Sequence, residues 1–337
     1  MNICTKVLVF MAMVGIGSSY ASNESDFSLL TSGTNEPLKL FANKKEFQER
    51  SYSYENAKKD TLALRKHLEG TSHTVTLSSG LALPVTHFDR HSRTVVILGQ
   101  GFLEGKERWN AVVPLLADYD VVVFDYRWLQ ATSWWYVDHP GKRFVLDEKE
   151  DVIRVVNFVK KLKTYTKVIG LAECYSCFTF AAAQADQEVK GNQLFDRLIF
   201  DCAFVSLDCA CKNMLNNQGG NNKREPRWLK LFLRNTIVPW PIVRAMRFVI
   251  PRIALQDHIK NIKQAPILFI HGKNDQLIPF KKLVKECWSV TNTKKFLFIT
   301  PFWHVSNFTD WGVYKWVCDA FIQPSNVDDF IKNVSLA

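Results

Sequence analysis

Short apolar runs rich in β-branched residues alternate with helical stretches from residue 72 onward, and this alternation limits the possible folds more than any other feature. Several runs are apolar on both faces, which is typical of strands buried inside a parallel sheet. Segments with a helical pattern, such as 147–163 and 175–187, lie between them. Alternating strands and helices predict an α/β fold in which helices cover both faces of a mostly parallel sheet. The predicted strands are 94–98, 121–125, 167–171, 197–200, 266–270 and 295–299.

The segments before the first parallel strand have different patterns. Residues 72–89 alternate between polar and apolar side chains and predict an antiparallel hairpin. The polar stretch 22–43 is typical of a loose leader, and the charged stretch 44–70 predicts a helix that ends at Gly70. The predicted units are a signal peptide (1–21), an N-terminal leader and helix (22–71), the first part of the α/β core (72–205), a helical cap (206–262), the second part of the core (263–325) and a C-terminal tail (326–337).

The predicted cap breaks the alternation because residues 206–262 contain no convincing strand and four prolines. Its central part, 223–252, carries eight Lys or Arg residues and one acid, a net charge of +7, out of +10 for the chain. Trp, Phe and Leu are interleaved with these cations, a composition that suits an anionic membrane surface. A plain solvated face of the cap is the alternative. We expect no nucleic-acid partner, because no binding module is recognisable.

The N-terminus has the pattern of a signal peptide. Lys6 precedes the apolar run 7–16, and Ser19 and Ala21 stand three and one residues before a cleavage site that follows Ala21. The run is too short to span a bilayer, which excludes a polytopic membrane protein. The sequence therefore predicts a secreted or periplasmic protein. The alternative is a protein anchored to the membrane by an uncleaved signal anchor.

A candidate nucleophile follows the strand at 167–171. The residues Ala172-Glu173-Cys174-Tyr175-Ser176 have the form small-x-nucleophile-x-small between a strand and a helix, which is the nucleophile elbow. The helix N-terminus favours a thiolate at Cys174. Three alternatives remain open at this point: a structural thiol, a redox pair with Cys177, and an inactive register that places Ala172 at the nucleophile position.

Two further candidates follow strands as well. Asp275 comes after strand 266–270, and His304 comes after strand 295–299. The carboxyl ends of parallel strands meet at one edge of a sheet, so these side chains are predicted to converge with Cys174. Asp275 as a simple helix cap and His304 as a core histidine are the structural alternatives. Asp201, just past strand 197–200, is an alternative acid, and Asp310 is a weaker one.

With these residues in place, the chain resembles the α/β-hydrolase superfamily over roughly residues 72–322, most closely the branch of the monoacylglycerol lipases and serine aminopeptidases. The resemblance implies that Cys174 is the nucleophile, Asp275 the acid and His304 the base, and that the backbone N–H groups of Phe102 and Tyr175 form an oxyanion hole. The matching stretches are LGQGF (98–102), VVVFDYRW (121–128), VIGLAECYSC (168–177), LIFDCAFVSL (198–207), PILFIHGKNDQLIP (266–279) and FWH (302–304).

The chain departs from the usual pattern of this superfamily at two turns. Ala172, Cys174 and Ser176 replace the Gly-x-Ser-x-Gly of the elbow, and Gln100 with Gly101 replaces the usual His-Gly. Enzymes similar to dienelactone hydrolase use a cysteine within the same superfamily, so the nucleophile is compatible with the resemblance.

The expected function is that of an exported hydrolase that cleaves carboxylic esters or related acyl bonds through a Cys-His-Asp triad. Its substrate would be a small molecule or a lipid with a hydrophobic acyl group, and no metal or organic cofactor is expected. The alternative is a catalytically inactive protein of the hydrolase fold that binds an anionic envelope or host partner through its basic cap. The sequence sets no oligomeric state.

Overall fold

The structure is a computed structural model. It describes residues 27–31, 38–40, 69–101, 104–130, 147–206, 254–275, 277–288, 293–304, 307, 310–326 and 328–330. The predictions for the signal peptide, for nearly all of the helix at 44–70, for the basic stretch 223–252 and for Phe102 lie outside these residues.

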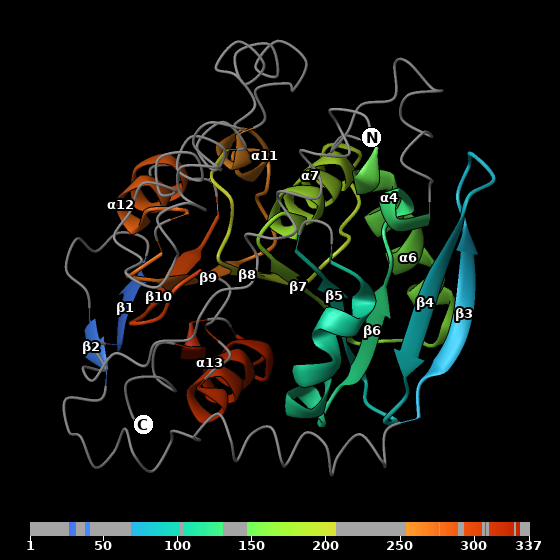
Figure 1. Ribbon diagram of the computed structural model, residues 1–337, viewed down its shortest axis with the longest axis horizontal. Helices are drawn as coiled ribbons and strands as arrows, with labels where there is room; N and C mark the ends of the chain where they lie inside the picture. Colours follow the sequence, from blue (N-terminus) through green and yellow to red (C-terminus); the bar gives the residue numbers. More distant parts are fainter. Residues whose placement is uncertain are drawn as a thin grey trace, which may run out of the picture.

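The described residues form one ten-stranded sheet with the strand order β2-β1-β10-β9-β8-β7-β5-β6-β4-β3, which runs from left to right in Figure 1. The six strands from β10 to β6 are parallel to one another. Each of these six predicted strands is confirmed to within one or two residues. They are β5 (Thr94–Gly99), β6 (Asp120–Phe124), β7 (Lys167–Glu173), β8 (Arg197–Asp201), β9 (Ile267–Gly272) and β10 (Lys295–Thr300).

The predicted hairpin at 72–89 is also confirmed. Strands β3 (Thr71–Thr76) and β4 (Ala82–Phe88) pair antiparallel, with Thr71 opposite His87, and β4 pairs antiparallel with β6. Because Val75 is the one buried residue of β3 and most of the others are exposed, the strand suits the outer edge of the sheet.

Two strands at the opposite edge correct the sequence-based expectation. β1 (Phe27–Thr31) pairs antiparallel with β10, and β2 (Leu38–Leu40) pairs antiparallel with β1. The loose leader predicted over 22–43 is therefore wrong for these residues. The backbone groups that β1 needs as partners belong to β10, far away along the chain, so the local polar composition contained no signal of the pairing.

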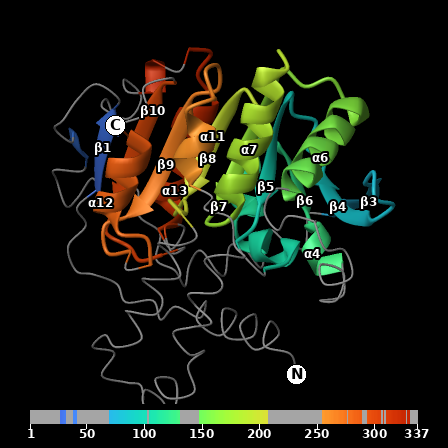
Figure 2. The same ribbon diagram turned by 90° about the horizontal axis from the view of Figure 1, so that it is seen from above.

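Helices cover both faces of the sheet, as predicted. One face carries α6 (Glu148–Leu162), α7 (Ser176–Val189), α11 (Leu255–Ile259) and α12 (Phe280–Leu283), whose apolar residues share a single core cluster. Figure 2 looks onto this face, with α6 and α7 in front of the strands. The other face carries α13 (Trp311–Ile322) and two short 3₁₀ helices, η1 (Lys106–Ala111) and η2 (Val113–Leu116). The short helix α4 (Arg127–Gln130) follows β6.

Strand β5 shows why the sheet has two apolar cores. Val95 and Ile97 belong to the core under α7, whereas Val96 and Leu98 belong to the core under α13. Successive side chains of a strand point to opposite faces, so an uninterrupted apolar run is buried only between two layers of helices. The position of the central strands thus follows directly from their composition.

Close packing sets the position of α7 against the sheet. A Cβ atom at Gly99 of β5 would lie 2.5 Å from the ring of Phe180, and a Cβ at Gly170 of β7 would lie 2.8 Å from the same ring. Phe180 therefore packs directly against the backbone of both strands. This contact holds the N-terminus of α7 at the carboxyl ends of β5 and β7.

The predicted cap is described only at its two ends. Ser206 and Ala254 form an isolated antiparallel bridge, and Leu255 donates a backbone hydrogen bond to Val205. The chain therefore leaves the core after β8 and returns to it at the same place before β9. Among the residues that the structure describes, no helix is both long and apolar enough to cross a membrane.

Candidate active site

Cys174 occupies a strained turn between β7 and α7. Strand β7 ends at Glu173, helix α7 begins at Ser176, and Cys174 has a φ of 53°. Residues other than glycine rarely adopt a positive φ, because the Cβ atom then crowds the backbone. Such strain is concentrated at functional sites. Ala172 lies within β7, paired with Gly99, so the register that would place Ala172 at the turn does not occur.

The local hydrogen bonds hold this turn in place. The backbone N–H of Cys174 donates to the carbonyl of Asp201 over 2.8 Å, and its carbonyl accepts from the N–H groups of Cys177 and Phe204. The Sγ atom of Cys177 donates to the carbonyl of Ala172 at 3.2 Å. The two thiols of the C-x-x-C sequence therefore have different partners, since Cys174 contacts His304.

Cys174, His304 and Asp275 converge at the carboxyl edge of the sheet. The Sγ atom of Cys174 lies 3.3 Å from Nε2 of His304, and Nδ1 of His304 lies 2.7 Å from Oδ2 of Asp275. The other carboxylate oxygen of Asp275 accepts the backbone N–H groups of Leu277 and Ile278 at 2.9 and 2.8 Å. Asp275 thus stabilises its own loop and binds His304 with the same carboxylate, as its position at a strand end predicts.

The charges in this group reinforce one another. Burial opposes ionisation of Asp275, but the facing imidazole of His304 holds the pKa of the carboxyl below its ordinary value. Burial also opposes protonation of His304, but the carboxylate raises the pKa of the imidazole well above its ordinary value. Burial raises the pKa of the Cys174 thiol, against the pull of His304. The arrangement therefore favours a thiol that transfers its proton to a strengthened base, rather than a free thiolate.

The two alternative acids have other partners. The carboxylate of Asp201 accepts a hydrogen bond from Nδ2 of Asn307, which also donates to Sγ of Cys202 at 3.0 Å. Burial and the neighbouring Glu173 raise the pKa of Asp201 to about 6. Asp310 is the N-cap of α13 and accepts the backbone N–H of Val313 at 3.2 Å. The position facing His304 Nδ1 belongs to Asp275.

The turn after β5 lies against the elbow. A Cβ atom at Gly101 would stand 3.8 Å from Cβ of Cys174, and Tyr175 stands at the start of α7. The hydroxyl of Ser176 donates to the carbonyl of Gln100 and accepts a hydrogen bond from the Tyr126 hydroxyl at 2.9 Å. The hydroxyl of Ser176, one of the departures from the superfamily pattern, therefore ties the elbow to the backbone of the turn after β5. Phe102, the other predicted oxyanion residue, lies outside the described residues.

An ionic cluster beside Cys174 was not predicted from the sequence. The Arg108 guanidinium donates to both oxygens of the buried Glu173, at 2.9 and 3.3 Å, and lies 3.5 Å from Oε2 of Glu104. Glu104 also accepts a hydrogen bond from the backbone of Gly101, and burial together with Glu173 raises its pKa to about 7. Glu173 adjoins the nucleophile in sequence, but its partners come from the β5–β6 connection, so only the fold brings this cluster together.

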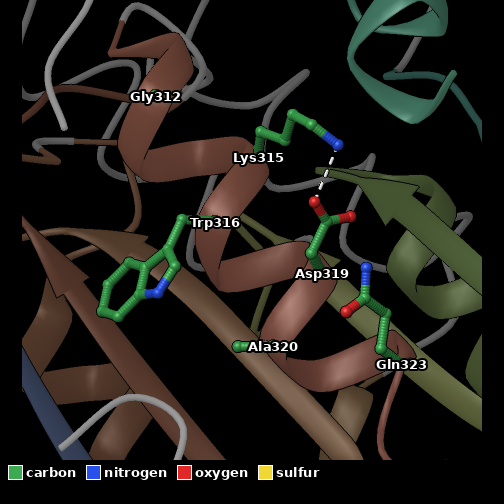
Figure 3. Close-up of a pocket in the computed structure, with 6 residues that line it drawn as sticks. All are labelled: Gly312, Lys315, Trp316, Asp319, Ala320 and Gln323. Atoms are coloured by element: carbon green, nitrogen blue, oxygen red, sulfur yellow. Dashed lines mark hydrogen bonds and ion pairs between the residues drawn. The ribbon is translucent and has the colours of Figure 1, made fainter. Parts of the chain in front are cut away.

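A shallow hollow along α13 lies apart from these residues. Figure 3 shows Lys315 reaching Asp319 along the helix, where their side-chain atoms are 2.7 Å apart, with the Trp316 indole on the other side. None of the three converging residues lines this hollow. Nothing in its composition assigns it to a reaction. Its lining residues are Gly312, Lys315, Trp316, Asp319, Ala320 and Gln323.

Comparison with solved structures identifies the fold as that of the α/β-hydrolases. The chain is similar to the Pyrococcus furiosus esterase Pf2001, with a TM-score of 0.56 and 18% identity, over 81% of this chain and 92% of the esterase. It is similar to a hydrolase from Pseudomonas aeruginosa, with a TM-score of 0.51 and 16% identity, over 75% and 99% of the two chains.

A third similar structure is described as a membrane phospholipase A that is a bacterial virulence factor. Its TM-score is 0.50 at 14% identity, over 84% of this chain and 94% of the phospholipase. No protein-family model matches the chain, and no curated protein matches its sequence. At these identities, the similarity establishes the α/β-hydrolase fold that the sequence predicted.

Proposed function

We propose that this chain is a hydrolase of carboxylic esters or related acyl bonds and that Cys174, His304 and Asp275 are its catalytic residues. The observation that carries the proposal is the hydrogen-bonded series from Cys174 Sγ through His304 to Asp275, placed on a strained elbow in a hydrolase fold. A nucleophile, a base and a group that orients the base, in this mutual geometry, are what acyl transfer requires.

The reaction follows from the positions of the atoms. The Cys174 sulfur attacks the acyl carbon while Nε2 of His304 accepts the thiol proton, and Asp275 stabilises the imidazolium through its hydrogen bond with Nδ1. The backbone N–H groups of Tyr175 and Phe102 are proposed to stabilise the oxyanion. His304 then protonates the leaving group, and the acyl group remains on Cys174 as a thioester. A water molecule, deprotonated by His304, cleaves the thioester and restores the thiol.

The substrate and the location belong to the same proposal. An esterase and a phospholipase among the similar structures fit a small-molecule or lipid substrate. The hydrophobic acyl group is part of the proposal. The basic, aromatic-rich stretch 223–252 supports contact with an anionic membrane surface. The signal-peptide pattern over 1–21 supports export, either as a secreted or periplasmic protein or as one held by an uncleaved anchor.

The test compares the chain with Cys174→Ala on p-nitrophenyl esters of graded acyl length. The expected results are hydrolysis by the parent, a thioester on Cys174 detected by mass spectrometry after rapid quenching, and loss of both in the variant. Cys318→Ala is the matched control, because Cys318 is a buried thiol of α13, on the other face of the sheet. Equal turnover by Cys174→Ala and the control would refute the mechanism. A folded parent with no turnover and no labelling would favour the inactive binding protein.

A further inference from the structure

A second thiol, Cys202, lies against the same histidine. It follows β8 with a φ of 50°, is fully buried, and its sulfur lies within 4.8 Å of a ring nitrogen of His304. Its sulfur also accepts a hydrogen bond from Nδ2 of Asn307 at 3.0 Å. The mechanism proposed above does not use Cys202, although the structure places its sulfur next to the base of the reaction.

Cys202, Asp275 and His304 have the composition of a metal site. One sulfur, one carboxylate oxygen and one ring nitrogen from these residues all lie within 4.8 Å of one another. In a tetrahedral zinc site with bonds of about 2.0–2.3 Å, the donor atoms are about 3.5 Å apart. The His304 Nδ1 and Asp275 Oδ2 atoms, at 2.7 Å, would have to separate by less than about 1 Å to admit the ion.

We propose that Cys202, Asp275 and His304 form a binding site for one thiophilic divalent cation of the Zn²⁺ class, and that this cation inhibits the hydrolase. Thiolate is a soft donor and imidazole a borderline one, and together they select Zn²⁺ and its relatives over Mg²⁺ or Ca²⁺. The charges also match, because a thiolate and a carboxylate balance a divalent cation in a buried site, where an uncompensated charge is costly. Asn307, which binds both Cys202 and Asp201, holds the sulfur in position.

Binding of the cation releases one proton and changes the protonated nitrogen of His304. The cation forms bonds with Cys202 Sγ, His304 Nδ1 and an Asp275 oxygen, and the Cys202 thiol releases its proton to solvent. The proton on Nδ1 is replaced by the metal, so the neutral imidazole carries its proton on Nε2. Nε2 then has no lone pair for the Cys174 proton. Inhibition rests on the proposed function, whereas binding of the cation does not.

The test titrates Cd²⁺, a spectroscopic probe for thiolate ligands, into the full chain under reducing conditions. Cys209→Ser and Cys211→Ser are introduced first, because a C-x-C pair can bind Cd²⁺ by itself. We expect a thiolate-to-cadmium absorption band that saturates at one equivalent. The band should persist in Cys174→Ala and be lost or greatly weakened in Cys202→Ser. Removing a residue that only supports a metal ligand weakens metal binding roughly 10- to 100-fold. Cys202 is a direct ligand in this proposal, so Cys202→Ser should lose at least that much affinity for Cd²⁺.

Two variants make the result decisive. Loss of the band in Cys174→Ala would show that Cys174 is the thiolate ligand and would overturn the assignment. A band that is unchanged in Cys202→Ser, or absent from the parent, would overturn it as well. Thermal melting confirms that each variant is folded.

The activity arm uses Zn²⁺ with an ester substrate. Inhibition of Cys202→Ser should require at least about tenfold more Zn²⁺ than inhibition of the parent, each form being compared with its own activity without metal. Equal sensitivity of the two forms would refute the inhibitory role. If neither form has esterase activity and the Cd²⁺ results are as expected, the metal site stands and the proposed function fails.

Discussion

Replacing Asp275 with asparagine removes one charge from the centre of the proposed mechanism and changes little else in shape. The amide oxygen of Asn can still accept the backbone N–H groups of Leu277 and Ile278, which now bind Oδ1 of Asp275. The amide NH₂ group, however, would face Nδ1 of His304 as a donor. The imidazole would then accept at Nδ1 and carry its proton on Nε2, which is the wrong tautomer for a base acting on Cys174.

The magnitude follows from the distance. A carboxylate and an imidazolium 2.7 Å apart attract each other by about 6 kcal/mol at an effective dielectric constant of about 20. Asp275 is only 4% exposed, so solvent screens the pair little. At about 1.4 kcal/mol for each factor of ten, the full term corresponds to about four orders of magnitude in rate. We therefore expect Asp275→Asn to lower kcat about 10³- to 10⁴-fold.

The assay is steady-state hydrolysis of a p-nitrophenyl ester, accompanied by thermal melting to confirm that the variant is folded. Asp310→Asn is the matched control, because Asp310 caps α13 and asparagine is an equally good N-cap. The control should keep its activity. A folded Asp275→Asn protein with kcat within tenfold of the parent would refute the assigned role of Asp275.

Four further predictions test the surroundings of the site, the packing of α7 and the basic stretch. The pKa of Glu104 is raised to about 7, so this side chain becomes negatively charged as pH rises from 6 to 8 and then disfavours the Cys174 thiolate. The alkylation rate of Cys174 in Glu104→Gln, divided by the rate in the parent, should therefore increase over this interval. The same raised pKa means that the folded protein binds more protons than the unfolded chain between about pH 4.3 and 7, so the parent loses stability as pH rises through this interval. The free energy of unfolding of Glu104→Gln, measured in urea, should therefore rise relative to that of the parent, and a difference that is constant with pH would contradict this. Gly99→Ala should cost about 1–3 kcal/mol in urea unfolding, because its Cβ would lie 2.5 Å from the Phe180 ring, and unchanged stability would disprove the close packing of α7. Anionic vesicles should sediment the protein at low salt and release it at high salt, and replacing four cations in 223–252 with Gln should abolish binding; indifference to salt would refute the electrostatic contact.

Much of the site was predictable because its residues occupy positions that the strand pattern defines. β7, β9 and β10 are apolar on both faces, so their membership of a buried parallel sheet follows from their composition. Once the strands are parallel, their carboxyl ends share one edge, and residues just beyond those ends must meet. Cys174, Asp275 and His304 were therefore identifiable from local sequence.

Other features depended on contacts between distant parts of the chain. Asp275 and Asp201 both follow strands, and only the loop geometry placed Asp275 against His304 and gave Asp201 to Asn307. The register of the elbow was decided by the positive φ of Cys174, which the sequence allows but does not require. The choice of acid and the register of the elbow both depend on distances of a few ångströms in the folded protein, which the hydrophobic periodicity of the sequence does not specify.

The sequence by itself thus determined the layered α/β architecture, the positions of the core strands along the chain and the three converging residues, because uninterrupted apolar runs are a local property that specifies buried strands and their ends. Tertiary structure alone decided that β1 pairs with β10, that Arg108 binds both Glu104 and Glu173, and that Cys202 lies close to His304. These contacts join residues that are far apart along the chain and have no periodic signature. They depend on the tertiary fold, which brings these distant segments side by side.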